Sequence, residues 1–211
     1  MKKWGVLLGC LGAILVVVLG FVVWGVGVYN RLVQLDEAVT SQWAQVENVY
    51  QRRFDLIPNL VRTVQGAANF EKTTLQNVIE ARSRVGQVTT GGGAPVGAPN
   101  PTTNPQAFQQ FENAQAGLGN ALSRLLVVVE RYPELKANQN FLELQSQLEG
   151  TENRITVERR RYNNVAQTFN ATIRRFPANL IAGMTGFQAK QYFKAQAGAE
   201  QAPTVNFDFG K

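Results

Sequence analysis

Two carboxylates, Glu149 and Glu152, stand three residues apart in a segment with helical periodicity, so they are expected on one helix face. Glu47, on another predicted helix, is a candidate neighbour, and carboxylates that converge in a bundle can hold a hard cation or two metals. Two-metal bundles normally add histidine ligands, and this chain contains no histidine. We therefore favour a partly buried polar network, because a buried charge needs a partner. The arginines that can supply the partner are Arg52, Arg53 and Arg154.

The chain lacks the residues on which most catalytic sites depend. Without histidine, there is no histidine-based triad and no two-histidine metal site. The single cysteine, Cys10, lies in an apolar run, and no Lys-Ser or Lys-Thr follows Gly91–Gly93 as in a phosphate-binding loop. We predict a protein that is not an enzyme, with no catalytic residue, no metal and no cofactor. The remaining enzymatic alternative is a metal site built from carboxylates alone.

The most basic segment contains Arg159, Arg160 and Arg161, with Arg174 and Arg175 further along the same predicted helix. Three consecutive arginines point around a helix, so the simplest interpretation is a solvated face. The alternative is a contact with lipid headgroups or an acidic partner. Nucleic acid is not an expected partner, because the domain has no recognisable nucleic-acid-binding fold and is expected to be tethered to a membrane.

The first 28 residues predict a membrane anchor. Trp4 to Val28 is an uncharged run of 25 residues, and about 20 apolar residues suffice to cross a bilayer. The run is too long for a cleaved signal peptide, whose apolar part covers about 7–15 residues. Lys2 and Lys3 precede it, which favours a cytoplasmic N-terminus and an exported domain over 29–211.

Small residues within the anchor indicate how it can associate. Gly5, Gly9 and Ala13 repeat every four residues, a spacing that lets two membrane helices approach closely and predicts a homo-oligomer. Cys10 follows Leu7-Leu8-Gly9, which loosely resembles the site at which lipoproteins are lipidated. We favour the simpler interpretation, in which Cys10 is a small apolar residue inside a membrane helix.

Residues 29–66 predict one long helix. Apolar residues follow an eleven-residue repeat that starts at Leu32, and this period is typical of a nearly straight helix. Pro58 predicts either a kink, with Asp55 capping a restarted helix, or a curved but continuous helix. We favour the continuous helix, because the apolar stripe passes Pro58 without a shift.

The rest of the chain predicts an all-α fold, an elongated up-down antiparallel four-helix bundle with two long and two shorter helices. A Gly/Pro-rich linker covers 86–105, and a tail over 178–211 is expected to dock on the bundle with its extreme end free. Within that tail only Val205–Phe209 alternates as a strand does. The three helices after the first are expected at 71–85, Pro105–Tyr132 and Asn140–Phe176.

Several blocks, in order along the chain, resemble the LemA family; they are Leu35–Glu37, Trp43–Glu47, Tyr50–Leu60, Tyr132–Asn138, Leu148–Ile155, Arg161–Asn163 and Phe176-Pro177. The resemblance implies a single-pass protein of the bacterial inner membrane, with an elongated helical bundle and a role in membrane or envelope organisation. It supplies no enzymatic activity and therefore no catalytic residues.

From these observations we expect a non-enzymatic, membrane-anchored scaffold or adaptor that contacts membrane lipid and self-associates. The alternative is a partner of a membrane protease in protein quality control, which binds through the bundle surface or the C-terminal tail. In that case Val205–Lys211 would add as a strand to its partner.

Overall fold

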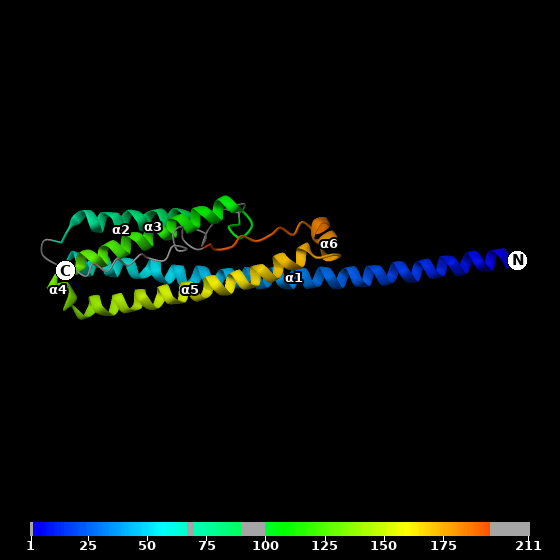
Figure 1. Cartoon of the computed structure of the whole chain (residues 1–211), viewed down its shortest axis with the longest axis horizontal. Coiled ribbons are helices and arrows are strands. Elements are labelled where there is room, and N and C mark those ends of the chain that lie inside the picture. The colour runs from blue at the N-terminus through cyan, green and yellow to red at the C-terminus, as the bar shows by residue number, and fades with distance from the viewer. Residues whose placement is uncertain (1, 67–69, 90–99, 195–211) are drawn as a thin grey trace, which may run out of the picture.

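The first helix extends from the N-terminus to the far tip of the bundle without a break. The structure is a computed structural model that describes residues 2–66, 70–89 and 100–194, without the side chains of residues 2–10 and 89. Helix α1 covers Lys2–Gln65, which is 64 residues and about 96 Å at 1.5 Å per residue. Pro58 lies inside it, so the favoured continuous helix is confirmed. Figure 1 shows its N-terminal part projecting beyond the other helices.

Helix α5, Gln139–Arg174, lies antiparallel along the inner part of α1 (Figure 1). It begins where the Asn138 side chain accepts hydrogen bonds from the backbone N–H groups of Asn140 and Phe141, as an N-cap residue does. Its buried face includes Thr151, which the spacing of apolar residues predicts to point inward. The apolar stripes of the two long helices therefore face each other along most of α5.

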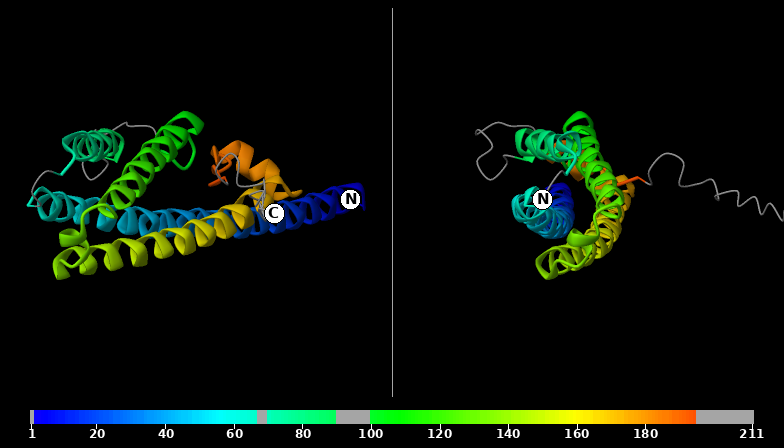
Figure 2. Two further views of the ribbon diagram at one scale, coloured as in Figure 1. Left: turned by 60° about the vertical axis from the view of Figure 1, so that its left-hand side comes forward. Right: turned by 90° about the vertical axis from the view of Figure 1, so that its left-hand side faces the viewer.

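Helices α2, Lys72–Thr89, and α3, Pro105–Val129, form a second antiparallel pair. Asn104 caps α3 by accepting from Gln106 N and Ala107 N, and Pro105 occupies the first helical turn. This pair covers only the half of the rod that is distant from the N-terminus, and α3 crosses α1 and α5 obliquely (Figure 2). The short helix α4, Pro133–Lys136, connects α3 to α5.

The predicted bounds of α2, α3 and α5 differ from the structure, and α5 ends at Arg174, two residues before its predicted end at Phe176. Helix α2 continues to Thr89, beyond its predicted end at Val85, so the predicted linker begins later; its residues 90–99 lie outside the described ranges. Helix α3 ends at Val129 because Pro133 disfavours helix in the residues before it. These differences leave the all-α class unchanged, and no strand occurs among the described residues.

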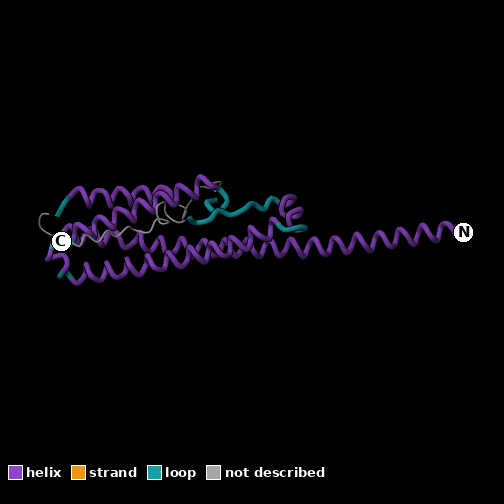
Figure 3. The backbone as a smooth tube through the Cα atoms, in the orientation of Figure 1, coloured by secondary structure: helices purple, strands orange, loops and turns teal. Residues whose placement is uncertain are grey.

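The final described segment folds back over the bundle. Helix α6, Ala178–Thr185, packs against both α1 and α5, and Gly186 ends it with φ of 79°, a left-handed conformation that suits glycine. Residues 187–194, which we call the strap, then return without regular structure towards the start of α3 (Figure 3). Docking of the tail is thus confirmed as far as residue 194, whereas Val205–Phe209 lies outside the described residues.

The buried side chains form two clusters along the rod. The distal cluster joins α1 beyond Ile57 to α2, α3, α4 and the start of α5. The second cluster, nearer the apolar run, joins Val39–Tyr50 of α1 to the start of α3, the later part of α5 and Phe193 of the strap. The candidate site lies around the second cluster and at its border with the first.

Candidate functional site

Arg53 is the charged group at the centre of the bundle. Only 4% of its side chain is exposed, and its Nη1 donates to Glu152 Oε1 at 2.7 Å. Its Nη2 donates to the backbone oxygen of Gln115 at 3.2 Å and also to the Gln115 side-chain oxygen. The guanidinium lies 5.1 Å from the centroid of the Tyr50 ring. One side chain of α1 therefore connects α3 and α5, and the predicted pairing of Glu152 with an arginine is confirmed.

The other members of the predicted polar network lie elsewhere. Glu149 is exposed and accepts from Gln145 Nε2 at 3.0 Å within its own helix, and Arg154 is exposed beside Glu158 and Arg161. These two residues are exposed and thus not part of a buried network; Arg154 lies on a surface groove that α5 forms with Gln45 and Val49 of α1. In the described part of the chain, no group of three or more histidine, cysteine or acidic side chains is placed to hold a metal.

Glu47 is also separate from Arg53. Its Oε1 accepts from the Trp43 indole N–H at 2.8 Å, one turn earlier on α1. Partial burial raises the pKa of the Glu47 carboxyl, and the hydrogen bond from Trp43 offsets part of that rise. No hydrogen bond or ion pair joins Glu47 to Arg53, Glu149 or Glu152 among the described residues; its hydrogen-bond partner is Trp43.

The three consecutive arginines have three different surroundings. Arg159 is half-buried, pairs with Glu112 at 3.4 Å, donates to the Lys194 backbone oxygen at 3.0 Å and lies over the Phe193 ring. Arg161 is exposed and pairs with Glu158 at 2.7 Å, while Arg160 is exposed. They do not form one patch, because successive helical residues point in different directions.

Aromatic rings from four parts of the chain meet in the second cluster. Trp43 of α1 stacks on Phe193 of the strap with ring centroids 5.8 Å apart and planes 13° apart. Tyr162 of α5 is fully buried edge-on to Trp43 at 5.3 Å, and burial raises the pKa of its phenol. Phe108 and Phe111 of α3 complete the cluster, at 5.8 and 5.3 Å from Trp43. Such ring pairs add stability beyond the apolar area that they bury.

Two asparagines of α5 hold the strap in place. Asn163 donates to the Phe193 backbone oxygen at 2.9 Å and accepts from the Phe193 N–H at 3.0 Å. Asn170, two turns later, makes the same pair of bonds with Lys190, at 2.9 and 2.8 Å. Each asparagine side chain thus pairs with both the N–H and the C=O of one strap residue, as the backbone of a neighbouring β-strand would.

Lys190 attaches the strap to α1 as well. Its ammonium group pairs with the Asp36 carboxylate at 2.5 Å and is 7% exposed. Sequence analysis assigned no role in the site to Asn163, Asn170, Lys190 or Phe193. The available signal was the spacing of seven residues between the asparagines, each following an inward aromatic residue, Tyr162 or Phe169.

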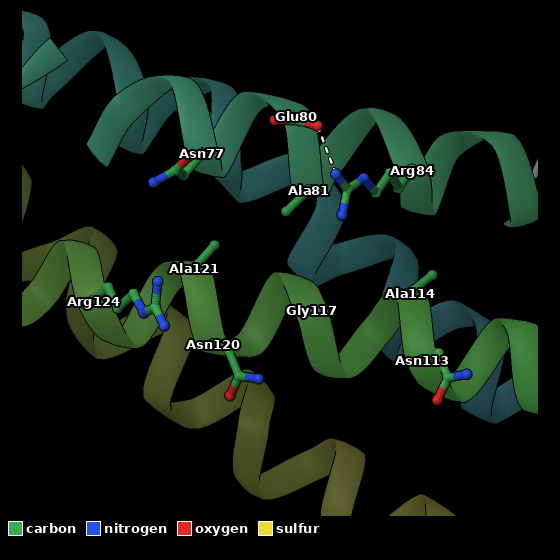
Figure 4. A pocket seen from close by; sticks show the side chains of 10 residues that line it. All are labelled: Asn77, Glu80, Ala81, Arg84, Asn113, Ala114, Gly117, Asn120, Ala121 and Arg124. Atoms are coloured by element: carbon green, nitrogen blue, oxygen red, sulfur yellow. Dashed lines mark hydrogen bonds and ion pairs between the residues drawn. The ribbon is translucent and has the colours of Figure 1, made fainter. Parts of the chain in front are cut away.

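A shallow groove of about 300 Å³ lies between α2 and α3. Its floor has small residues, among them Ala81, Ala114 and Gly117, which let the two helices approach closely. Figure 4 shows its rim, where Arg84 pairs with Glu80 at 2.6 Å and amide and arginine side chains come from α3. The rim offers hydrogen-bond donors and acceptors to a partner but no arrangement of groups for acid–base chemistry.

The apolar start of α1 is the remaining candidate. This helix is long and apolar enough to cross a membrane, and residues 11–24 of its apolar segment are exposed. In the predicted packing face, Ala13 is exposed, whereas the surroundings of Gly5 and Gly9 lie outside the described residues. Gly20 and Gly27 lie on the same side of the helix, with no atom of the chain within 4 Å of an added Cβ.

Comparison with known proteins places the bundle among relatives. The model of the LemA family matches residues 42–207. The chain is 30% identical over 177 residues to Magnetosome protein MamQ 2 of Paramagnetospirillum magneticum, a match that covers 79% of this chain and 64% of the relative. It is 24% identical over 157 residues to Protein LemA of Metamycoplasma hominis, covering 74% of this chain and 64% of that protein. The chain thus spans a little under two thirds of the length of the curated relatives that it matches.

Proposed function

Because the chain belongs to the LemA family, and because its membrane-length helix runs unbroken into the bundle core, we propose that it is a non-enzymatic, membrane-anchored scaffold. It self-associates and organises the membrane or cell envelope around it. The observation that carries this proposal is the continuity of α1. The same helix that supplies the apolar segment also supplies Trp43, Arg53 and Ile57 to the core, so the anchor cannot turn independently of the bundle.

Hydrogen bonds and ion pairs between the helices favour a bundle that moves as one rigid body. Arg53 connects α1, α3 and α5, and the strap connects α5 to α1 through Asn170, Lys190 and Asp36. A rigid rod attached to the membrane presents its surface, including the α2–α3 groove, at a set distance from the bilayer. That property suits a scaffold on which copies or other proteins gather.

The proposed assembly uses the face of α1 that carries Gly5, Gly9 and Ala13. From Gly9 to Gly25 the helix turns by about 160°, at 3.6 residues per turn. A Cβ on Gly25 would lie 4.0 Å from the Ile181 side chain of α6, so α6 lies on the opposite side from the small residues. The small-residue face is therefore free of α6 and available to a second membrane helix.

The test is the mass of the full-length protein in detergent, measured by light scattering. We expect an oligomer of the 23.3 kDa chain that Gly9→Leu combined with Ala13→Leu dissociates, because larger side chains keep the helices apart. The matched control is Ile14→Leu with Val18→Leu, on the other side of α1, which should leave the mass unchanged. A wild-type monomer across the accessible concentrations would exclude the self-associating scaffold and leave the protease-partner adaptor as the function to pursue.

A further inference from the structure

The most exposed large apolar side chains among those described are at α6. Met184 is 87% exposed and Phe176, just before the helix, is 80% exposed. Leu180, one turn from Met184 on the same side of α6, is 58% exposed. The opposite side, with Ala178 and Ala182, is buried against the long helices. Helix α6 therefore packs small residues against the protein and exposes its large apolar residues on the opposite side.

The position of α6 along α1 identifies what covers these side chains. Ile181 approaches Gly25, which lies within the uncharged run, and Phe187 lies 6.1 Å from the Tyr29 ring. The run of 25 residues is about 37 Å long, whereas a bilayer's hydrocarbon core is about 30 Å thick. The level of Gly25 to Tyr29 is thus where α1 leaves the hydrocarbon, and Trp24 and Tyr29 are exposed there, as in an interfacial aromatic belt.

Basic residues adjoin the apolar surface on the side of the bundle. Arg174 and Arg175 end α5 immediately before Phe176, both are exposed, and neither has an ion-pair partner among the described residues. Cations beside exposed apolar residues match the boundary between acyl chains and anionic headgroups. Figure 1 shows α6 at the point where α1 emerges from the bundle, on its flank rather than along its axis.

We propose that α6 is a second membrane contact, in which Phe176, Leu180 and Met184 enter the interfacial layer and Arg174 and Arg175 bind lipid phosphates. The contact lies to one side of α1, so it restricts rotation and tilt of the bundle about its anchor. This inference depends on α1 crossing the membrane, and it assigns to α6 a lipid ligand that the scaffold proposal does not require.

The test uses the full-length protein in vesicles of phosphatidylcholine and phosphatidylglycerol. An environment-sensitive fluorophore is attached to Leu180→Cys in a Cys10→Ala background, and nitroxide-labelled lipids serve as quenchers. The matched controls are Val18→Cys within the apolar run and Leu142→Cys, an exposed site at the distal end of α5. We expect quenching at positions 180 and 18 and none at position 142.

The outcomes separate this inference from its premise. Quenching at position 18 without quenching at position 180 would overturn the α6 contact and leave the anchor intact. Absence of quenching at both would overturn the anchor itself. An emission at position 180 that is unquenched and changes with the protein-to-lipid ratio would instead place a second copy of the chain on α6.

A second experiment tests the role of Arg174 and Arg175 in lipid binding. Arg174→Gln with Arg175→Gln should reduce quenching at position 180 in anionic vesicles to the level seen in neutral ones. Arg160→Gln with Arg161→Gln, an equal loss of exposed charge earlier in α5 and distant from α6, is the control and should not reduce it. Equal effects of the two pairs would show that general charge, and not a site beside α6, attracts the lipid.

Discussion

At the scale of single residues, Arg53 illustrates how a buried charge is tolerated in this core. Its Nη1 and Nη2 donate to a carboxylate, an amide oxygen and a backbone oxygen, whereas its buried Nε–H has no hydrogen-bond partner. Glu152 is half-exposed, so much of the electrostatic gain is screened by solvent. The main role of Arg53 is therefore to donate hydrogen bonds to the buried oxygens of Gln115 and so to position α3 against the two long helices.

We expect Arg53→Ala to lower the free energy of unfolding by about 3 kcal/mol, because it leaves the buried oxygens of Gln115 without a donor and removes packing. Glu152→Gln keeps an acceptor at a half-exposed position and should cost only about 1 kcal/mol. Chemical denaturation in detergent, followed by far-ultraviolet circular dichroism, measures both. Arg52→Ala, exposed in the same turn, is the control, and an Arg53→Ala effect no larger than that of Arg52→Ala would contradict a stabilising network.

At the scale of elements, the strap depends on side chains of α5 rather than on a strand of its own. Asn170→Ala should leave the N–H and C=O of Lys190 unpaired in a buried position, at a cost of about 2–3 kcal/mol for the strap. The measurement is hydrogen exchange, in which residues 188–194 should lose protection while α1 and α5 keep theirs. Asn164→Ala, exposed on the same helix, is the control. Unchanged protection of the strap in Asn170→Ala would show that Phe193 and Lys190 hold it without the asparagine.

At the scale of the whole molecule, the two lysines before the apolar run predict that the bundle lies on the outer side of the cytoplasmic membrane. In a Cys10→Ala background, Leu142→Cys should react with a membrane-impermeant maleimide in intact spheroplasts. Lys3→Cys, on the other side of the run, should react only after permeabilisation. The reverse pattern would place the bundle in the cytoplasm, without affecting the continuity of α1 or the packing of the bundle.

The periodicity of apolar residues predicted α1, α2, α3 and α5, because a helix buries one face and the residues of that face recur at a regular local spacing. The short helices α4 and α6 were not predicted. The continuous α1, the inward Thr151 and the polar core position at Gln115 all follow from that pattern. The candidate site was predicted less well. Of the carboxylates with helical spacing, only Glu152 meets Arg53, because spacing along one helix does not show which side chains of another helix lie opposite.

The sequence by itself determined the all-α class, the membrane-length apolar run and the family to which the chain belongs, because these depend on composition, local order and contiguous motifs. Only the tertiary structure decided that Asn163 and Asn170 bind the strap, that Phe193 completes the aromatic cluster and that α6 lies beside Gly25. These contacts join residues up to about 150 positions apart, as for Trp43 and Phe193. They form because the packed helices bring those residues together in space, and no local pattern in the sequence predicts that arrangement.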